Sequence, residues 1–339
     1  MCTEQIRLIR NDLCLSVFSD QILQTKGPRA QGGEASLPVT QPERVRRLRD
    51  TITDEALKSM GLPASGWPRK LIAPAIGRAT NRFAGLFAAL DQDIARLGFC
   101  QAARRFLPHF VIGCQQSGAG SIPDAGPLLV AANHPGATDG LVIAAALPRD
   151  DLRIVISDVP FTRALSSGRE HLIYASWDAN ERAHAVREMI RHLRDGGAVL
   201  IFPSGHLDPD PACMPGAAAW LADWSRSVVL ALRRVPETWL VATIVGGVLV
   251  PRFLSHPLVR LGPQGWKRQK LAEVLQIICQ LLFKTRYALT PRVTFGQPTT
   301  LAALREQSTL GDLEAIVNHA RQVLAAHLAQ DRAAVVPFL

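Results

Sequence analysis

Two polar segments of the chain contain residues that can move protons and bind polar groups. In the first, Asn133-His134-Pro135-Gly136-Ala137-Thr138-Asp139, a histidine and an aspartate lie five positions apart across a Pro-Gly turn. An aspartate that accepts a hydrogen bond from one imidazole nitrogen leaves the other nitrogen as a base, so the spacing predicts acid–base chemistry at His134. The alternative is that Asp139 caps a following helix and His134 makes only a loop hydrogen bond.

The second segment, Pro203-Ser204-Gly205-His206-Leu207-Asp208-Pro209-Asp210-Pro211, directly follows an apolar run at 198–202. Proline and glycine favour a tight loop whose N–H groups, together with the Ser204 hydroxyl, can hold a polar or anionic substrate group. A purely structural turn explains the proline and glycine equally well.

Strand and helix patterns alternate around both segments. Apolar runs predict strands at 128–132, 153–157, 198–202, 240–249 and 292–296, and helical spacing predicts helices at 181–194, 216–234 and 312–329. This alternation predicts an α/β fold with a mostly parallel central sheet flanked by helices on both faces. Reactive groups in such folds gather in the loops that follow the strands, so both polar segments are expected at one edge of the sheet.

The chain is basic, with a net charge of +9 and a pI of 9.7. Residues 251–300 contain eight Lys and Arg and one acid, whereas residues 111–250, which contain both polar segments, are net acidic. This distribution favours an anionic partner such as a phosphorylated metabolite or a membrane surface, away from the chemistry. Nucleic-acid binding is not expected, because the chain has no helix-turn-helix, zinc or RNP pattern.

Two further features predict the compartment. The longest charge-free apolar run, at 239–250, is about half the length of a membrane-spanning helix, so any membrane contact is expected to be peripheral. The six cysteines show no CxxC pair or zinc-ligand spacing, and no secretory signal precedes them. Reduced thiols in a cytoplasmic protein are therefore expected, either free in the cytoplasm or peripheral at the cytoplasmic face of the membrane.

Taken together, the two segments resemble the motifs of the glycerolipid acyltransferase family, which includes lysophosphatidic acid and glycerol-3-phosphate acyltransferases. The family's first motif, Asn-His followed by four residues and Asp, corresponds to Asn133, His134 and Asp139. Its third motif, usually Phe-Pro-Glu-Gly-Thr, resembles Phe202-Pro203-Ser204-Gly205-His206, and the stretch up to Pro211 looks closer to the soluble, plastid-type glycerol-3-phosphate enzymes. The similarity covers about residues 126–298.

The resemblance implies transfer of a fatty acyl group from acyl-CoA or acyl carrier protein to a hydroxyl of a glycerolipid precursor in phospholipid biosynthesis. The expected acceptor is 1-acylglycerol 3-phosphate or glycerol 3-phosphate. His134 would be the general base, oriented by Asp139, and backbone N–H groups around Gly136 or Gly205 would stabilise the oxyanion. The resemblance implies no metal and no cofactor beyond the acyl donor as co-substrate. Substrate contacts are expected from Asn133, Gly136, Phe202, Pro203, Ser204, Gly205 and His206.

The sequence departs from the family in its phosphate-binding groups. The region that corresponds to the second motif, 172–178, contains no cation, and Ser204 stands where the family has Glu. Arg163, Arg169 and Arg182 lie in neighbouring loops and can replace the missing cation, and we expect Arg163 to contact the acceptor. The departure leaves two alternatives open: an acceptor without a phosphate, or a non-catalytic lipid-binding protein of the same fold.

Composition and helical spacing divide the chain into three regions. Residues 1–42 are expected to form an N-terminal segment and a flexible linker, because 24–42 are rich in Gly, Pro, Gln and Ser. Helical spacing at 43–60 and 69–107 predicts a helical region at 43–110 that packs on the catalytic domain or on a membrane surface, and the acyltransferase catalytic domain is expected at 111–335.

A further amphipathic helix is expected near residues 271–283, after Lys267, Arg268 and Lys270. It can lie on an anionic membrane, or it can be an ordinary packed helix with a solvated basic start.

Two other chemistries compete with acyl transfer. A hydrolase would use Ser204 as nucleophile, but the Gly-x-Ser-x-Gly elbow is absent because Pro203 precedes the serine. A metal site would draw on both polar segments, but their spacing matches no standard zinc site. Its ligands would be His134, Asp139, His206, Asp208 and Asp210.

Overall fold

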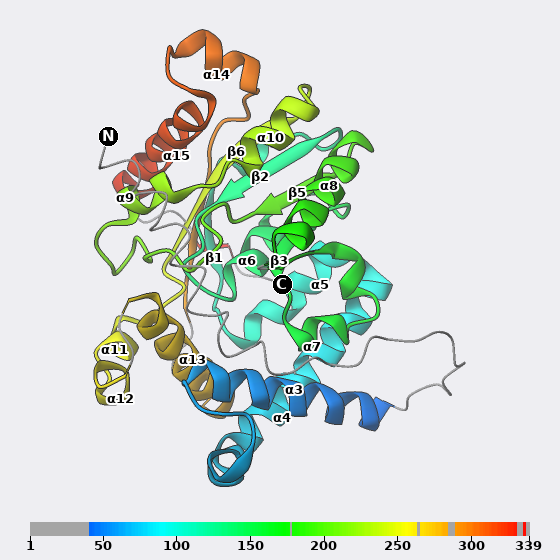
Figure 1. Ribbon diagram of the computed structural model, residues 1–339, viewed down its shortest axis with the longest axis vertical. Coiled ribbons are helices and arrows are strands. Elements are labelled where there is room, and N and C mark those ends of the chain that lie inside the picture. Colours follow the sequence, from blue (N-terminus) through cyan, green and yellow to red (C-terminus); the bar gives the residue numbers. More distant parts are fainter. Residues whose placement is uncertain (1–40, 177, 263–264, 284–288, 331–334, 337–339) are drawn as a thin grey trace.

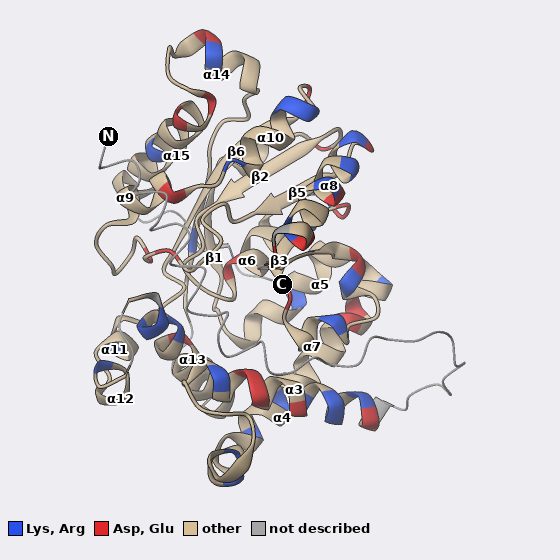
Figure 2. Ribbon diagram, viewed as in Figure 1, with Lys and Arg blue, Asp and Glu red and all other residues tan. Residues whose placement is uncertain are grey.

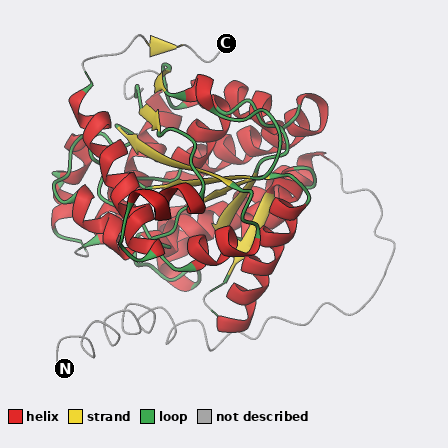
Figure 3. Ribbon diagram, turned by 90° about the horizontal axis from the view of Figure 1, so that it is seen from above, coloured by secondary structure: helices red, strands yellow, loops and turns green. Residues whose placement is uncertain are grey.

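The protein forms a mixed sheet between two layers of helices (Figures 1 and 3). The structure is a computed structural model that describes residues 41–176, 178–262, 265–283, 289–330 and 335–336. Within these residues the sheet has the order β4-β3-β5-β2-β6-β7-β1-β8. Its strands are β1 Cys114–Ser117, β2 Leu128–Ala132, β3 Arg153–Ser157, β4 Leu172–Ala175, β5 Ala198–Ile201, β6 Trp239–Gly246, β7 Arg292–Phe295 and β8 Val335–Val336.

The five strands from β4 to β6 are parallel to their neighbours, and so are β7 and β1. Antiparallel pairs join β6 to β7 and β1 to β8. The predicted α/β fold, with a mostly parallel sheet and helices on both faces, is confirmed. Most of the predicted N-terminal segment and linker, residues 1–40, lies outside the described residues.

The burial of the central strand β2 shows why the sheet has a layer of helices on each face. All five of its residues are buried, and successive side chains point to opposite faces of the sheet. Leu128, Val130 and Ala132 enter one core, while Leu129 and Ala131 enter the other. A continuous apolar run therefore serves both cores, as expected for a parallel strand covered on two sides.

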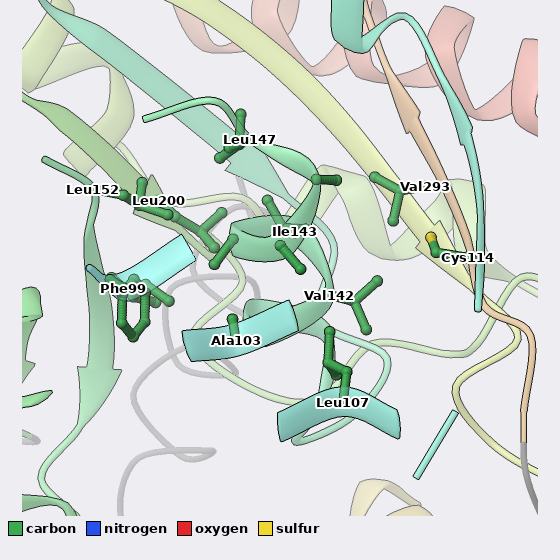
Figure 4. Close-up of a cluster of buried hydrophobic side chains, with 14 of the residues drawn as sticks. Phe99, Ala103, Leu107, Cys114, Val142, Ile143, Leu147, Leu152, Leu200 and Val293 are labelled. Carbon is green, nitrogen blue, oxygen red and sulfur yellow. The ribbon is translucent and has the colours of Figure 1, made fainter. Parts of the chain in front are cut away.

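The first core lies between the sheet and the helices α4 Gly66–Leu97, α5 Phe99–Phe106, α6 Asp139–Ala146 and α13 Trp266–Phe283. Figure 4 shows part of it, with Phe99 and Ala103 of α5 beside Ile143 of α6. The second core is covered by α8 Ala179–Arg194, α10 Ser227–Arg234, α14 Leu301–Gln307 and α15 Asp312–Ala329. Shorter helices are α7 Pro160–Arg163, α9 Ala217–Trp220, α11 Pro251–Leu254 and α12 Pro257–Arg260.

The N-terminal helices dock on the α/β fold through both apolar and charged contacts. Helix α3, Gln41–Ser59, packs on α4, and Arg44 of α3 forms an ion pair with the buried Asp91 of α4. Asp91 also accepts hydrogen bonds from the backbone N–H groups of Ser166, Ser167 and Gly168. A single carboxylate thus joins both helices to the loop that precedes β4.

Some predicted boundaries differ from the structure. The helix predicted at 69–107 is divided at Gly98, whose φ of 83° is a left-handed backbone conformation that favours glycine. The strand predicted at 240–249 ends at Gly246, and the helix predicted at 216–234 consists of α9 and α10 with a turn between them. Among the described residues, no helix is long and apolar enough to cross a membrane.

Candidate active site

Three neighbouring parallel strands bring the polar segments together. Because β5, β2 and β6 are adjacent and run in the same direction, their carboxyl ends lie at one edge of the sheet. The loop after β2 carries His134, the loop after β5 carries 202–211, and the loop after β6 carries 247–250. The edge predicted from the strand pattern is therefore where both segments meet.

His134 and Asp139 form a hydrogen-bonded pair. His134 Nδ1 lies 2.9 Å from Asp139 Oδ2, and the same carboxylate accepts from the N–H of Gly136 at 3.1 Å and of Gly140 at 2.6 Å. A carboxylate oxygen accepts hydrogen bonds, so the contact with Asp139 assigns the imidazole proton to Nδ1. Nε2 then keeps its lone pair, and the His134 side chain is 27% exposed. This geometry can deprotonate a bound hydroxyl.

Asp139 also begins helix α6. Its hydrogen bond from Gly140 satisfies one N–H of the first helical turn, and a carboxylate there interacts favourably with the helix dipole. The helix-capping alternative is not what the structure shows, because the N-cap position is Thr138 and Asp139, the first helical residue, pairs with His134.

The charges around His134 favour its protonated form more than in a histidine that is free in water. Burial lowers the pKa of His134, but the negative charges of Asp139, Asp208 and Glu273 outweigh it and raise the pKa above its ordinary value. The neutral imidazole, which is the form that accepts a proton, is therefore reached at higher pH than in a free histidine.

Phe202 and Asn133 hold the histidine loop from either side. The Phe202 ring, at the end of β5, stacks on the His134 ring with centroids 4.4 Å apart. The side chain of Asn133 donates to Val245 O at 2.9 Å and accepts from Val245 N at 2.7 Å, which fixes the end of β2 to β6. Both were expected to contact substrate, and the contacts that the structure gives them are to the protein itself.

The Ser204 loop is also held by hydrogen bonds between its own residues. Ser204 Oγ donates to His206 O at 3.0 Å and lies 3.1 Å from Asp208 Oδ2. It has no imidazole partner among the described contacts, so the nucleophile–base hydrogen bond that a serine hydrolase needs is not formed. Pro203 is buried and its carbonyl accepts from Ser225 N. The His206 ring packs edge-on against Trp220, and its Nδ1 lies 3.6 Å from Asp208 Oδ1.

Of the backbone N–H groups around Gly136 and Gly205, those of the two glycines themselves have partners. Gly136 N–H donates to Asp139, and Gly205 N–H donates to Phe202 O in a tight turn for which Gly205 adopts a φ of 71°. A left-handed backbone of this kind favours glycine, so Gly205 also has a conformational role.

Arg163 does not join this group. It lies in α7 after β3, two strands from β2, and it forms a two-pronged ion pair with Asp158. Its guanidinium also lies 4.3 Å from the centroid of the Tyr174 ring. An arginine neutralised in this way is less suited to hold a phosphate than a free one.

Sequence reasoning gave no catalytic or positioning role to two carboxylates in the loop after β5. Asp208 Oδ2 accepts from His134 N at 2.8 Å, and Asp208 N donates to His134 O at 2.7 Å, so the two loops are joined by reciprocal bonds. Asp210 accepts backbone N–H bonds from Ala212, Gly247, Val248 and Leu249. The Asp-Pro-Asp-Pro sequence was the signal for both aspartates, but the backbone groups that they bind are distant in sequence.

Helix α13 supplies two more residues that the sequence did not reveal. Gln269 Nε2 donates to Pro135 O at 2.9 Å and to Asp208 O at 2.8 Å, and Glu273 accepts a hydrogen bond from Ala137 N. Among the described residues, no group of three His, Cys, Asp or Glu side chains is arranged to hold a metal ion.

Two comparisons with known proteins gave a match. A family model described as Acyltransferase matches residues 114–222. Among solved structures, the 1-acyl-sn-glycerophosphate (LPA) acyltransferase PlsC from Thermotoga maritima matches at 14% identity and a TM-score of 0.41, over 75% of this chain and 85% of that chain. No curated protein matches. The segment that matches the acyltransferase model contains both the His134–Asp139 pair and the Ser204 loop.

Proposed function

We propose that the protein is an O-acyltransferase that moves a fatty acyl group from acyl-CoA or acyl carrier protein to a hydroxyl of a glycerolipid precursor. The observation that carries this proposal is the His134–Asp139 hydrogen bond at the sheet edge, inside a domain that matches the acyltransferase model. A hydrogen-bonded pair with a reachable imidazole nitrogen is the arrangement that general-base transfer requires.

In the proposed reaction, His134 Nε2 removes the proton of the acceptor hydroxyl while its oxygen attacks the thioester carbonyl. The C–O bond forms, the tetrahedral intermediate collapses, and the C–S bond breaks. The imidazolium then returns the proton to the departing thiolate, which leaves an ester and a free thiol. Asp139 holds the Nδ1 proton throughout and stabilises the imidazolium, and no acyl-enzyme is formed.

The acceptor is proposed to be 1-acylglycerol 3-phosphate or glycerol 3-phosphate, on the strength of the motif resemblance. One observation favours a second candidate, a lipid hydroxyl without a phosphate. Arg163, the cation expected to bind the phosphate, is paired with Asp158 instead. An acceptor without that negative charge would need no such cation.

The protein is further proposed to act peripherally on an anionic membrane at the cytoplasmic face. Helix α4 carries exposed basic residues that include Lys70 and Arg78. On the same helix, Trp67 and Leu71 are 73% and 67% exposed, one turn apart. Figure 2 shows the positions of basic residues, with acidic residues between them, along the ribbons of α3 and α4. Cations next to exposed apolar side chains suit the interface of an anionic bilayer.

The direct test is an assay of the purified protein with radiolabelled acyl-CoA or acyl carrier protein. The acceptors offered are glycerol 3-phosphate, lysophosphatidic acid, other lysophospholipids and hydroxylated lipids. We expect labelled ester with at least one acceptor and a loss of about 10²-fold or more in His134→Ala. Product only with acceptors that lack a phosphate would select the second candidate. Undiminished transfer by a folded His134→Ala protein would exclude the mechanism, and no transfer to any acceptor would favour a lipid-binding protein.

A further inference from the structure

Helix α13 buries a stripe of polar side chains. Gln269, Glu273, Gln276 and Gln280 follow one another at intervals of four, three and four residues, which places them on one side of the helix. All four are at most 7% exposed. Burial of polar groups is costly unless each is hydrogen-bonded, so such a stripe needs specific partners.

The partners of the first three are in the loops that follow the three central strands. Gln269 joins the His134 loop at Pro135 O to the Ser204 loop at Asp208 O. Gln276 donates to Val248 O at 2.9 Å and accepts from Val250 N at 2.7 Å in the loop after β6. Gln269, Glu273 and Gln276 therefore form a clamp that sets these loops relative to one another.

Glu273 occupies the centre of this clamp. Its carboxylate accepts from Ala137 N, midway between His134 and Asp139 in the sequence. A Cβ on Gly136 would lie 2.6 Å from Glu273 Oε1 and 3.1 Å from Val248 Cγ2, so the glycine is what lets the carboxylate approach the main chain. Two segments that are more than 130 residues apart in the sequence make this close contact.

We propose that Glu273 is a positioning residue of acyl transfer: it anchors the main chain of the His134 loop at Ala137 and places a second carboxylate behind the His134–Asp139 pair. The inference rests on the proposed role of His134 as the base. Glu273 acts through the loop and through its charge, and it is not placed in contact with substrate.

The charges around Glu273 support this role. The pKa of Glu273 is raised to about 7, chiefly by burial and further by the charge of Asp139, while the hydrogen bond from Ala137 N and the charges of His134 and Lys270 act in the opposite direction. In turn the negative charges of Asp139, Asp208 and Glu273 raise the pKa of His134. Removing the charge of Glu273 alone should therefore lower the pKa of His134 and make the base available at lower pH.

The test compares two substitutions that separate the hydrogen bond from the charge. Glu273→Gln keeps an acceptor for Ala137 N but is neutral, whereas Glu273→Ala removes both. We expect Glu273→Gln to keep kcat within about threefold and to shift the acidic limb of kcat/KM to lower pH. Glu273→Ala should lower kcat by about tenfold or more with little change in KM, because the base is misplaced.

Gln280→Ala is the matched control. It removes another buried amide from the same helix, but the hydrogen bond that it removes goes to Phe110 O, outside the loops at the sheet edge. We expect lower thermal stability with the wild-type kcat and pH profile. A purely structural role for Glu273 predicts that Glu273→Ala behaves like this control, and that result would overturn the inference.

A titration of the His134 ring by NMR separates this inference from the proposed function, since it needs no substrate. A lower pKa of His134 in Glu273→Gln than in the wild type is expected. If wild-type protein transfers acyl groups but this pKa and the kcat of both Glu273 variants are unchanged, the inference fails and the function stands. If no acyl transfer is found, the function fails, and the shift in the titration still decides the coupling of Glu273 to His134.

Discussion

At the scale of single residues, the site is built around the imidazole of His134, and each residue that contacts His134 has a different role. Asp139 fixes the Nδ1 proton, Phe202 supports the ring, and Asp208 holds the main chain of the loop from the opposite side. None of these groups competes for Nε2 in the contacts described. The arrangement leaves a single atom free to accept a proton, as general-base catalysis requires.

The pH dependence of the reaction follows from this environment. The neutral imidazole is the active form, and the surrounding carboxylates raise the pKa of His134 above its ordinary value of 6.5. We therefore expect kcat/KM to be low at pH 5, to rise with pH through an apparent pKa above 6.5, and to level off at alkaline pH. Initial rates measured from pH 5 to 9 check this, with circular dichroism to show that the fold persists. A rate that is independent of pH over this range would contradict the assignment.

The histidine and its aspartate could be predicted because they are close in sequence and share one turn. Asp208, Gln269 and Glu273 could not, because their partners are 74, 134 and 136 residues away in sequence. A local pattern gives a residue's type and its immediate surroundings. It does not give the distant main-chain groups that the fold brings to it.

At the scale of elements, the strands that form continuous apolar runs were predicted correctly. Such runs identify β2 and β5, which are buried along their whole length, and β3, which is partly buried. The short strands β1 and β4 were missed, because β1 reads Cys-Gln-Gln-Ser and β4, at the edge of the sheet, has only four residues. Helix α13 was predicted from its apolar side, and its buried polar side was not recognised.

The loop after β6 depends on one carboxylate from the loop after β5. Asp210 is fully buried and accepts four backbone N–H bonds, three of them from 247–249. Asparagine would turn an amide donor toward these N–H groups, so we expect Asp210→Asn to lower the free energy of unfolding by about 2–4 kcal/mol. Urea unfolding followed by circular dichroism measures the change.

Asp158→Asn is the control for this prediction. Its carboxylate pairs with Arg163 at the surface, where an ion pair contributes at most about 1 kcal/mol. If both variants unfold at the same urea concentration, Asp210 does not hold the loop in the way that its hydrogen bonds indicate.

At the scale of the whole molecule, helix α13 connects the sheet edge to the N-terminal helices. Its polar side contacts the loops around His134, while α3 and α4 pack against it, and Arg82 of α4 donates to Leu281 O at 2.6 Å. The burial of Leu271, Ala272 and Leu281 fits the packed-helix alternative for α13, so this helix does not offer its main apolar side to a bilayer. The exposed apolar side chains of α4 are the better candidates for that contact.

The proposed membrane contact gives a prediction that only the assembled molecule can test. Replacing both Trp67 and Leu71 by alanine removes two largely exposed apolar side chains, each able to contribute about 1.5–3 kcal/mol when buried in a bilayer. We expect flotation with vesicles that contain anionic lipid to fall by about tenfold or more, and binding by the wild type to weaken at high salt because Lys70 and Arg78 are exposed on the same helix. Leu328→Ala on α15, where the leucine is 59% exposed, is the matched control and should float like the wild type. Equal flotation of all three proteins would place the membrane contact elsewhere, whereas a loss confined to the α4 variant would assign it to the helices that α13 joins to the site.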